Sequence, residues 1–349
     1  MEKQYLKSGI SILSLFFLTL ITISCKKEAN QVDSNIPATA YQLQIPFGFP
    51  APYLSEKNPL TYEGIELGKN LYSDPILSSN GRSCSTCHKA EKAFSSELFI
   101  DKEQNKISVM SHQNLAFRKH FTWNGALSDF DLVCMGDFEP EFFNTNPQLL
   151  FKNLKEHSQY PYLFQRAFGV KNIELISYDS IKVLICYAIT QYMKTMINSQ
   201  SKFDLYRQRK VLLSPEEYNG MIIFFSEKGD CFHCHGEPLF TDDDFHNNGL
   251  SSIFTGINRG REVFSKQNKD IGKFITPTLR NISKTFPYMH DGRFKTLEEV
   301  VEFYNSGVMD SETLDPIMNK RGETKELNLT PKEKSELVSF LKTLNDADK

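Results

Sequence analysis

The chain has 349 residues, of which 40% are hydrophobic and 24% are charged, and its formal net charge is -3. A chain of this length and apolar content can bury the cores of two domains and is not intrinsically disordered. The near balance of acidic and basic residues argues against a nucleic-acid-binding protein, which normally carries a basic excess.

The N-terminus has the pattern of a bacterial lipoprotein signal. Two lysines precede an apolar run at residues 10–23, which is short for a membrane span, and Cys25 follows closely. We therefore expect a signal peptide at residues 1–24, acylation of Cys25 and a flexible tether over residues 25–45. This places the protein in the periplasm as a membrane-tethered lipoprotein. An uncleaved signal anchor is the alternative.

Helical spacing of apolar residues predicts most of the remaining elements. Expected helices cover residues 61–72, 146–168 as one or two helices broken at Pro161, 178–199, 214–228, and a last helix from residue 330. The last two start with a hydroxyl residue, Pro and acids, which is a strong helix N-terminus. Because no stretch alternates with period two, we predict a mostly α fold with long loops.

The seven cysteines separate into groups. Besides Cys25, two pairs have CxxC spacing, and Cys134 and Cys186 remain. An exported protein can join this last pair by a disulfide, but sequence does not show that the two residues approach each other. The apolar helical pattern around Cys186 favours the alternative of buried free thiols.

Both CxxC pairs are followed directly by His, and CxxCH is the attachment motif of c-type haem. The two thiols add to the haem vinyl groups and the adjacent His binds the iron. Zinc is a weak alternative, because no further Cys pairs complete a zinc tetrad. We therefore predict two covalently bound c-type haems, with attachment residues Cys84, Cys87, Cys231 and Cys234 and iron ligands His88 and His235.

The two motifs belong to an internal repeat. Each follows a helical segment and precedes a similar step, Ala-Phe-Ser at Phe94 and Leu-Phe-Thr at Phe240. We therefore predict two cytochrome c-like haem domains in tandem, at residues 46–207 and 208–349.

Further motifs carry a family resemblance. They are Leu67–Tyr72 with Asp74-Pro75, Phe240–Asp242, Phe245–Asn247, Thr276–Asn281, Pro287–Arg293 and Thr296–Tyr304. With these residues the chain resembles the bacterial di-haem cytochrome c peroxidases and their MauG-like relatives over about residues 59–345. The resemblance implies that the N-terminal haem reacts with peroxide and that the C-terminal haem transfers electrons.

The resemblance also suggests roles for single residues. Tyr304 aligns with the sixth ligand of the transfer haem in MauG-like proteins, with Met309 or Met289 as alternatives. Trp123 aligns with a Trp that passes electrons between the haems, although it could be an ordinary buried Trp. Many relatives place a His on the far side of the first iron, soon after the first motif. Residues 89–111 contain none, so we expect an open first haem, with His112 as the fallback ligand.

Two further sites follow from the same comparison of motifs. A carboxylate must move a proton during peroxide cleavage, and Glu141 is our choice for that role, with Glu139 second. Main-chain carbonyls at Thr285 and Pro287 align with calcium ligands of the family. Ser108 stands where the family has a calcium-binding Asn, with Asn105 nearby.

These observations predict an enzyme that reduces hydrogen peroxide to water. Its electrons would come from a cytochrome c, a cupredoxin or a quinol-linked carrier, and we also consider a homodimer. One alternative is a MauG-like oxidase that acts on a protein or organic substrate through ferryl haem. The other is a non-enzymatic di-haem electron carrier.

Overall fold

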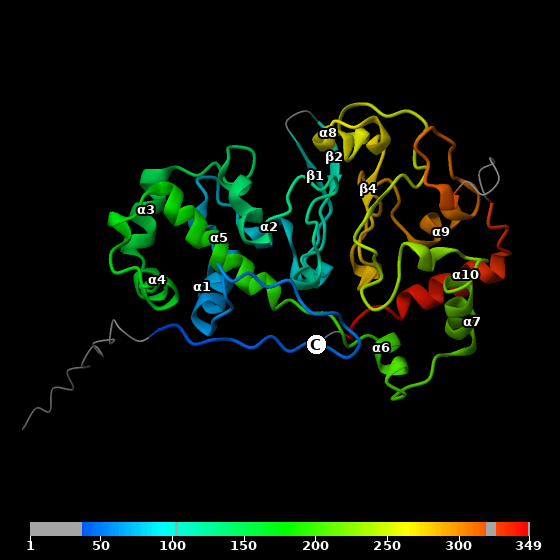
Figure 1. The fold of residues 1–349 in the computed structure, drawn as a ribbon, viewed down its shortest axis with the longest axis horizontal. Coiled ribbons are helices and arrows are strands. Elements are labelled where there is room, and N and C mark those ends of the chain that lie inside the picture. The colour runs from blue at the N-terminus through cyan, green and yellow to red at the C-terminus, as the bar shows by residue number, and fades with distance from the viewer. Residues whose placement is uncertain (1–36, 102–103, 319–325, 348–349) are drawn as a thin grey trace, which may run out of the picture. The chain divides into compact units, whose positions relative to one another are not determined.

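The computed structural model of the chain describes residues 37–101, 104–318 and 326–347 (Figure 1). The expected signal peptide, Cys25 and the first part of the expected tether lie outside these residues. None of the helices among the described residues has the length and apolar character that crossing a membrane requires.

Helices make up most of the regular structure. The α-helices of the described residues are α1 (Tyr62–Ser73), α2 (Cys84–Cys87), α3 (Pro147–Glu156), α4 (Tyr160–Phe168), α5 (Tyr178–Lys194), α6 (Lys202–Arg207), α7 (Pro215–Phe224), α8 (Glu262–Ser265), α9 (Leu297–Ser306) and α10 (Pro331–Lys342). Strands β1 (Leu98–Ile100) and β2 (Lys106–Ser108) form one antiparallel pair, and β3 (Phe245–His246) and β4 (Phe274–Ile275) form another. The prediction of a mostly α fold is confirmed.

The helix starts were predicted better than the helix ends. Ser214 and Thr330 cap α7 and α10, each in a reciprocal capping box with a Glu three residues later. By contrast, α5 ends at Lys194 rather than residue 199, and α7 ends at Phe224 rather than residue 228. The expected break at Pro161 was misplaced, because this Pro stands in the first turn of α4, where its missing N–H costs no hydrogen bond.

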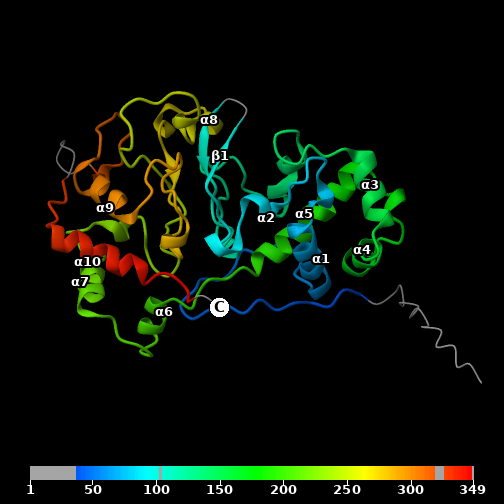
Figure 2. The same cartoon turned by 180° about the vertical axis from the view of Figure 1, so that it is seen from behind.

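The buried apolar residues fall into two main clusters. One contains residues between Leu67 and Met196, and the other contains residues between Phe203 and Leu344. Within the first cluster α1 packs against α5, and within the second α7 packs against α10, as Figures 1 and 2 show.

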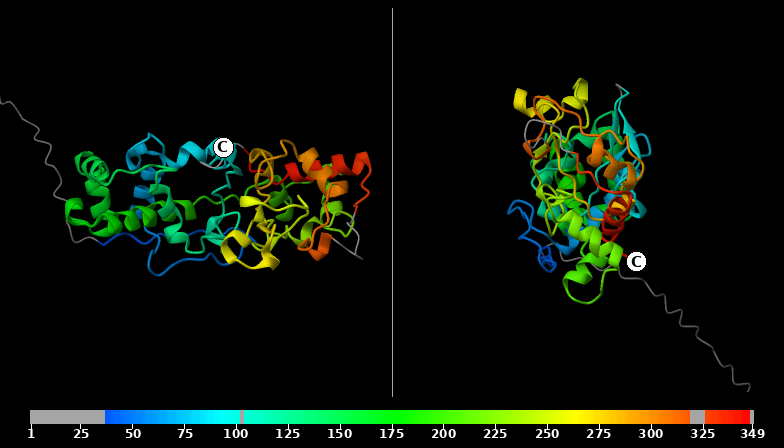
Figure 3. Two further views of the ribbon diagram at one scale, coloured as in Figure 1. Left: turned by 90° about the horizontal axis from the view of Figure 1, so that it is seen from above. Right: turned by 90° about the vertical axis from the view of Figure 1, so that its right-hand side faces the viewer.

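Both helix pairs cross at a glycine. A Cβ atom on Gly68 of α1 would collide with the backbone of α5 at Ala188, and one on Gly220 of α7 would collide with the backbone of α10 at Glu336. In each case the helix with the glycine leads to a CxxCH motif. The same close crossing is therefore used twice, and the two crossings can be followed by colour in Figure 3.

Candidate functional site

The first CxxCH motif lies on a single helical turn. Ser83 and Thr86 form a capping box at the start of α2, which contains Cys84 and Cys87, and His88 follows directly. The Nδ1 atom of His88 lies 3.0 Å from the carbonyl oxygen of Phe94, so this nitrogen acts as the donor and Nε2 is left as a metal ligand. Burial lowers the pKa of His88 to about 4, so the imidazole is neutral, as metal binding requires.

The second motif repeats this arrangement. The short 3-10 helix η6 (Cys231–His233) starts it, and the Nδ1 atom of His235 lies 2.9 Å from the carbonyl oxygen of Phe240. Burial again lowers the pKa of this His. Phe94 and Phe240 both adopt a left-handed backbone conformation, with φ of 56° and 53°. The repeated Phe step of the sequence is thus the segment that orients each imidazole.

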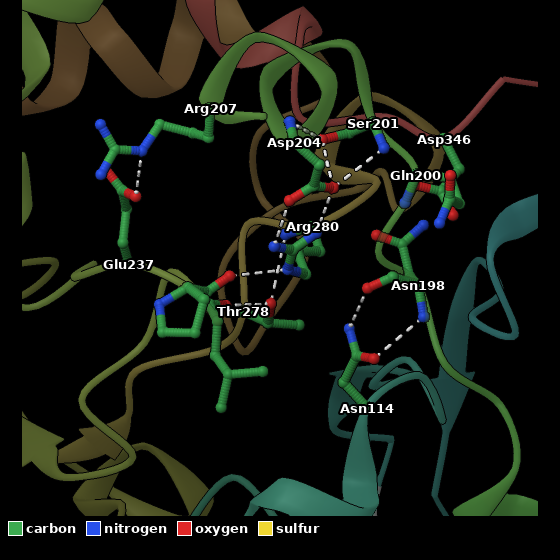
Figure 4. A network of polar contacts seen from close by, with 12 residues as sticks. Asn114, Asn198, Gln200, Ser201, Asp204, Arg207, Glu237, Thr278, Arg280 and Asp346 are labelled. Atoms are coloured by element: carbon green, nitrogen blue, oxygen red, sulfur yellow. Dashed lines mark hydrogen bonds and ion pairs between the residues drawn. The ribbon is translucent and has the colours of Figure 1, made fainter. Parts of the chain in front are cut away.

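A buried arginine anchors the loop that holds His235 (Figure 4). Arg280 is 2% exposed and donates two hydrogen bonds of 2.8 Å to Asp204 of α6. Its Nε atom donates to the carbonyl of Pro238 at 2.7 Å, and Thr278 Oγ1 donates to the carbonyl of Leu239 at 2.6 Å. Because these carbonyls immediately precede Phe240, the network fixes the residue that orients His235.

A mostly apolar cavity lies beside the second motif. Among its lining residues are Cys231, Cys234, His235, Met289, Tyr304 and Trp123. The set of donors fits a c-type haem, since two thiols and an imidazole with its Nδ1 atom engaged face one apolar space. Of the two alternatives to Tyr304, Met289 lines this cavity, whereas Met309 is 45% exposed.

Tyr304 extends from α9 into this cavity and has a polar partner there. The amide nitrogen of Asn248 donates to its hydroxyl oxygen at 3.0 Å. Burial raises the pKa of Tyr304 to about 12, and the bond from Asn248 opposes this shift by stabilising the phenolate. Sequence reasoning missed Asn248, which carries no motif signal of its own.

Trp123 lines the cavity of the second motif, although it belongs to the half of the chain that contains the first motif. Its Nε1 atom donates to the carbonyl of Ser108 in β2 at 2.7 Å. The backbone N–H of Ser108 donates in turn to the carbonyl of His290 at 2.8 Å. The indole therefore stands at a hydrogen-bonded junction between the segments around the two motifs.

His112 lies directly against the first motif. Its ring stacks on the ring of His88 with centroids 3.4 Å apart, and its Nδ1 atom lies 3.1 Å from the hydroxyl oxygen of Tyr72. Burial lowers the pKa of His112 well below its usual value. The structure thus places His112, the alternative iron ligand of the sequence analysis, against His88.

A carboxyl group that the sequence analysis did not name also lies near the first motif. Glu139 is exposed, and Glu141 is half-buried with its carbonyl accepting a 3.1 Å hydrogen bond from Arg82. Asp137 belongs to the 3-10 helix η4 (Phe130–Phe138), and burial raises its pKa to about 7. Burial is the main cause of the raised pKa of Cys84 and Cys87, and the negative charge of Asp137 adds to it at both thiols. The apolar residues around Asp137 were the available signal.

The residues expected to hold calcium come together only in part. The Ser108 hydroxyl donates to the carbonyl of Pro287 at 3.2 Å, and the Thr285 hydroxyl donates to the carbonyl of Ile282 at 3.2 Å. Asn105 instead bonds through its backbone and side-chain nitrogens to Asp101, at 2.8 Å each. Calcium is bound by oxygen atoms, and of the expected residues only Ser108 and Pro287 bring oxygen atoms into contact with each other.

His246 forms a charged bridge with two carboxylates beside the cavity of the second motif. Its Nδ1 atom lies 2.6 Å from Asp315 and its Nε2 atom lies 2.8 Å from Asp242. The two carboxylates raise the pKa of His246 to about 10 by hydrogen bonding to the imidazolium. This charged bridge joins two loops that line the cavity.

Comparisons with known proteins agree with this site. Residues 62–211 match the family model described as di-haem cytochrome c peroxidase. The methylamine utilization protein MauG of Methylophilus methylotrophus is 29% identical over 340 residues, covering 95% of this chain and 96% of that protein. The cytochrome-c peroxidase IdrP2 of Denitromonas iodatirespirans is 28% identical, covering 80% of this chain and 81% of that protein. Residues 62–211 thus match the di-haem cytochrome c peroxidase family, and both relatives are similar to this chain over most of its length.

Solved structures extend the likeness to the fold. A MauG-like protein associated with microbial copper homeostasis superposes with a TM-score of 0.78 and 28% identity, covering 88% of this chain and 96% of that one. The diheme peroxidase BthA of Burkholderia thailandensis shares the fold, with a TM-score of 0.68 and 20% identity, covering 89% of this chain and 95% of that one. These similarities support an oxidoreductase, and the matched family implies c-type haems.

Proposed function

We propose that this protein is a di-haem peroxidase that reduces hydrogen peroxide to water with electrons from a periplasmic donor. The observation that carries the proposal is the duplicated site. In both copies a CxxCH motif presents a half-buried neutral His whose Nδ1 atom donates to the carbonyl of a left-handed Phe.

The haems would be held by the residues already described. Cys84 and Cys87 would attach the first and Cys231 and Cys234 the second, with His88 and His235 as iron ligands. When bound, the haems supply the iron at which peroxide is reduced and through which electrons are delivered. The protein's own contribution is to fix both imidazoles and to surround them with apolar side chains.

The two halves of the chain would have different roles. We assign the peroxide reaction to residues 46–207 and electron transfer to residues 208–349, as two haem domains in tandem. The repeated helix crossings at Gly68 and Gly220 support this duplication. Trp123 would relay electrons between the halves, since its indole contacts the second cavity and is hydrogen-bonded to β2.

Proton movement at the first site needs a carboxyl group that titrates near neutral pH. Glu141 is the candidate chosen from the family resemblance, and we keep it in the proposal as the candidate based on sequence. The surroundings of Asp137 fit the role better, because burial raises its pKa to about 7. A carboxyl group with this pKa is populated in both protonation states at neutral pH, so it can accept a proton and return it.

A calcium ion completes the proposal. The carbonyl oxygens of Thr285 and Pro287 would be its protein ligands, with the Ser108 hydroxyl beside Pro287. Metal analysis of the purified holoprotein tests this directly. One calcium per chain supports the site, whereas no calcium, together with an unchanged spectrum after chelation, removes it.

The cellular setting is also part of the proposal. Acylation of Cys25 would anchor the protein to a membrane through a tether, with the haem domains in the periplasm. The electron donor would be a cytochrome c, a cupredoxin or a quinol-linked carrier. A homodimer is a further proposal, which sedimentation of the holoprotein tests.

Two observations favour other functions of the same site. Tyr304 in the second cavity, with Asn248 donating to it, favours a MauG-like oxidase of a protein or organic substrate, because a phenolate ligand lowers the haem reduction potential. His112 against His88 favours an electron carrier with both irons six-coordinate.

Low-temperature electron paramagnetic resonance separates these functions. A signal of the oxidised or half-reduced protein that changes with peroxide supports an enzyme, and assays with reduced donor proteins then distinguish peroxidase from substrate oxidase. Two low-spin signals that do not change with peroxide in either state would leave only the electron carrier.

A further inference from the structure

Two cysteines outside the haem motifs lie side by side in the first core cluster. Cys134 belongs to η4 and is 5% exposed, and Cys186 belongs to α5 and is fully buried. Both belong to the same cluster of buried residues, on two elements that pack against each other, and hydrogen bonding to the Cys186 thiol is the main cause of the raised pKa of Cys134. Both are free thiols in this structure. The sequence left open whether these residues approach each other, and the fold brings them together.

A second contact fixes how η4 and α5 pack in this region. Asp131, one 3-10 turn before Cys134, accepts a 2.7 Å hydrogen bond from the buried ammonium group of Lys194. Lys194 in turn lies about two turns after Cys186 on α5. The ion pair and the pair of thiols therefore belong to the same interface, and the ion pair keeps η4 from sliding along α5.

We propose that Cys134 and Cys186 form a disulfide in the exported protein. The S–S bond forms while the chain folds and both thiols are still accessible. The two thiols lose two protons and two electrons, and a protein disulfide of the thiol–disulfide exchange type accepts them and becomes a dithiol. Once the core closes, the bond is buried and reductants cannot reach it.

The position of the pair gives the disulfide a role in haem attachment. Cys84, the first attachment thiol, is buried in the same core cluster as Cys134 and Cys186. Three thiols in one core could pair in the wrong combination. A bond between Cys134 and Cys186 leaves Cys84 and Cys87 as the two thiols available to the first haem. This inference rests on the proposed export and haem attachment of the chain.

A peptide map of the full-length holoprotein tests the bond directly. The protein, purified after export, is unfolded in iodoacetamide without reductant, digested and analysed by mass spectrometry. We expect a Cys134 peptide linked to a Cys186 peptide, and alkylation of both residues only after reduction. Alkylation of both residues without reduction would overturn the proposal. Because the map reports sulfur chemistry alone, a protein that failed to reduce peroxide would still give a clear answer.

Haem stoichiometry tests the protective role. In Cys186→Ala, Cys134 has lost its partner and can form a disulfide with Cys84. We therefore expect haem content to fall from two towards one per chain. In the double variant Cys134→Ala/Cys186→Ala no such disulfide can form, and two haems per chain are expected. Two haems in the single variant would rule out this role. If the variants do not fold, the peptide map of the wild-type protein still decides whether the bond exists.

Discussion

The imidazole rings of His88 and His112 stack face to face, with centroids 3.4 Å apart and planes inclined by 21°. The Nδ1 atoms of both rings have other partners, the Phe94 carbonyl for His88 and the Tyr72 hydroxyl for His112. The stacking therefore brings two imidazoles, each a possible iron ligand, to one place. If His88 bound the haem iron, His112 would be a candidate for the second iron ligand, and its ring would have to leave the stacked position to bind.

Replacing His112 tests this relationship. In the oxidised wild-type protein, ligation by His112 gives a low-spin first haem, and His112→Ala is expected to convert it to a high-spin signal that responds to peroxide without prior half-reduction. Electron paramagnetic resonance before and after peroxide measures both effects. His120→Ala is the matched control, since His120 is engaged by the backbone of Asp243 instead. A wild-type signal that is already high-spin would show that His112 does not ligate.

Asp137→Asn should remove a group that titrates near neutral pH. Peroxide reduction by the variant is expected to fall about 100-fold, the usual contribution of a positioned acid–base group, and to lose its inflection near pH 7. Glu141→Gln, the matched carboxyl-to-amide change, should keep the wild-type profile. If Glu141→Gln loses the inflection instead, the sequence-based choice is correct.

The same substitution has a consequence for stability that does not require turnover. Because burial raises the pKa of Asp137 above its unfolded value of about 3.9, the folded state holds its proton more tightly than the unfolded state. The associated stability is complete below about pH 4 and is lost as the pH rises through about 7. Asp137→Asn should therefore unfold at higher denaturant concentration than the wild-type protein at pH 8. Equal midpoints would show that the pKa of Asp137 is not raised in the folded state.

Much of this site could be predicted from local patterns. CxxCH spacing predicts attachment and ligand residues without knowledge of the fold, because all of them lie within one turn of chain. The caps at Ser214 and Thr330 are equally local, since a hydroxyl and a Glu three residues apart satisfy each other. The end of α5 was missed because hydrophobic spacing continues past Lys194, while the chain turns to place Asn114 against Met196 and Asn198.

The missed residues depend on contacts between distant segments. Asp137 is an acid in an apolar stretch, and only the fold places it beside the thiols of α2. Asn248 and Arg280 act through partners 56 and 76 residues away. Single-sequence periodicity carries no information about such pairs, whereas the family resemblance supplied Tyr304 and Trp123 because their motifs are local.

Tyr304→Phe should change the second haem while leaving the first unaltered. The variant removes the phenolic oxygen, so we expect the low-spin signal of the second haem to shift and its reduction potential to change. Asn248→Ala should produce a smaller change in the same property, since it removes the donor to that oxygen. Met289→Ala is the matched control in the same cavity. A larger effect from Met289→Ala than from Tyr304→Phe would assign the ligand to Met289.

Arg280→Ala should destabilise the protein strongly. Breaking a buried ion pair by removing one partner costs about 3–5 kcal/mol, and here Asp204 would lose both of its 2.8 Å bonds to the guanidinium. The carbonyl of Pro238 would lose its donor as well, so the loop that orients His235 should loosen. Chemical denaturation measures the loss in the free energy of unfolding, and the absorption spectrum of the second haem reports whether the loop still orients His235. Arg207→Ala, which removes an exposed ion pair with Glu237, should cost less than about 1 kcal/mol.

The bridge between Asp242, His246 and Asp315 should give the protein an alkaline transition. The two carboxylates raise the pKa of His246 from about 6.5 to about 10, so the stabilisation is complete below about pH 6.5 and is lost as the pH rises through about 10. The melting temperature of the wild-type holoprotein should therefore fall across this range, together with a change in the spectrum of the second haem, because His246 lines that cavity. His246→Gln should lower the melting temperature at pH 7 by about 5 °C, a shift of ordinary size for the loss of one interaction, and should flatten its dependence on pH in the same window. His157→Gln, at the histidine that caps the end of α3 and packs against Tyr160, is the matched control. A wild-type profile without a step between pH 7 and 10 would show that His246 is neutral in the folded protein.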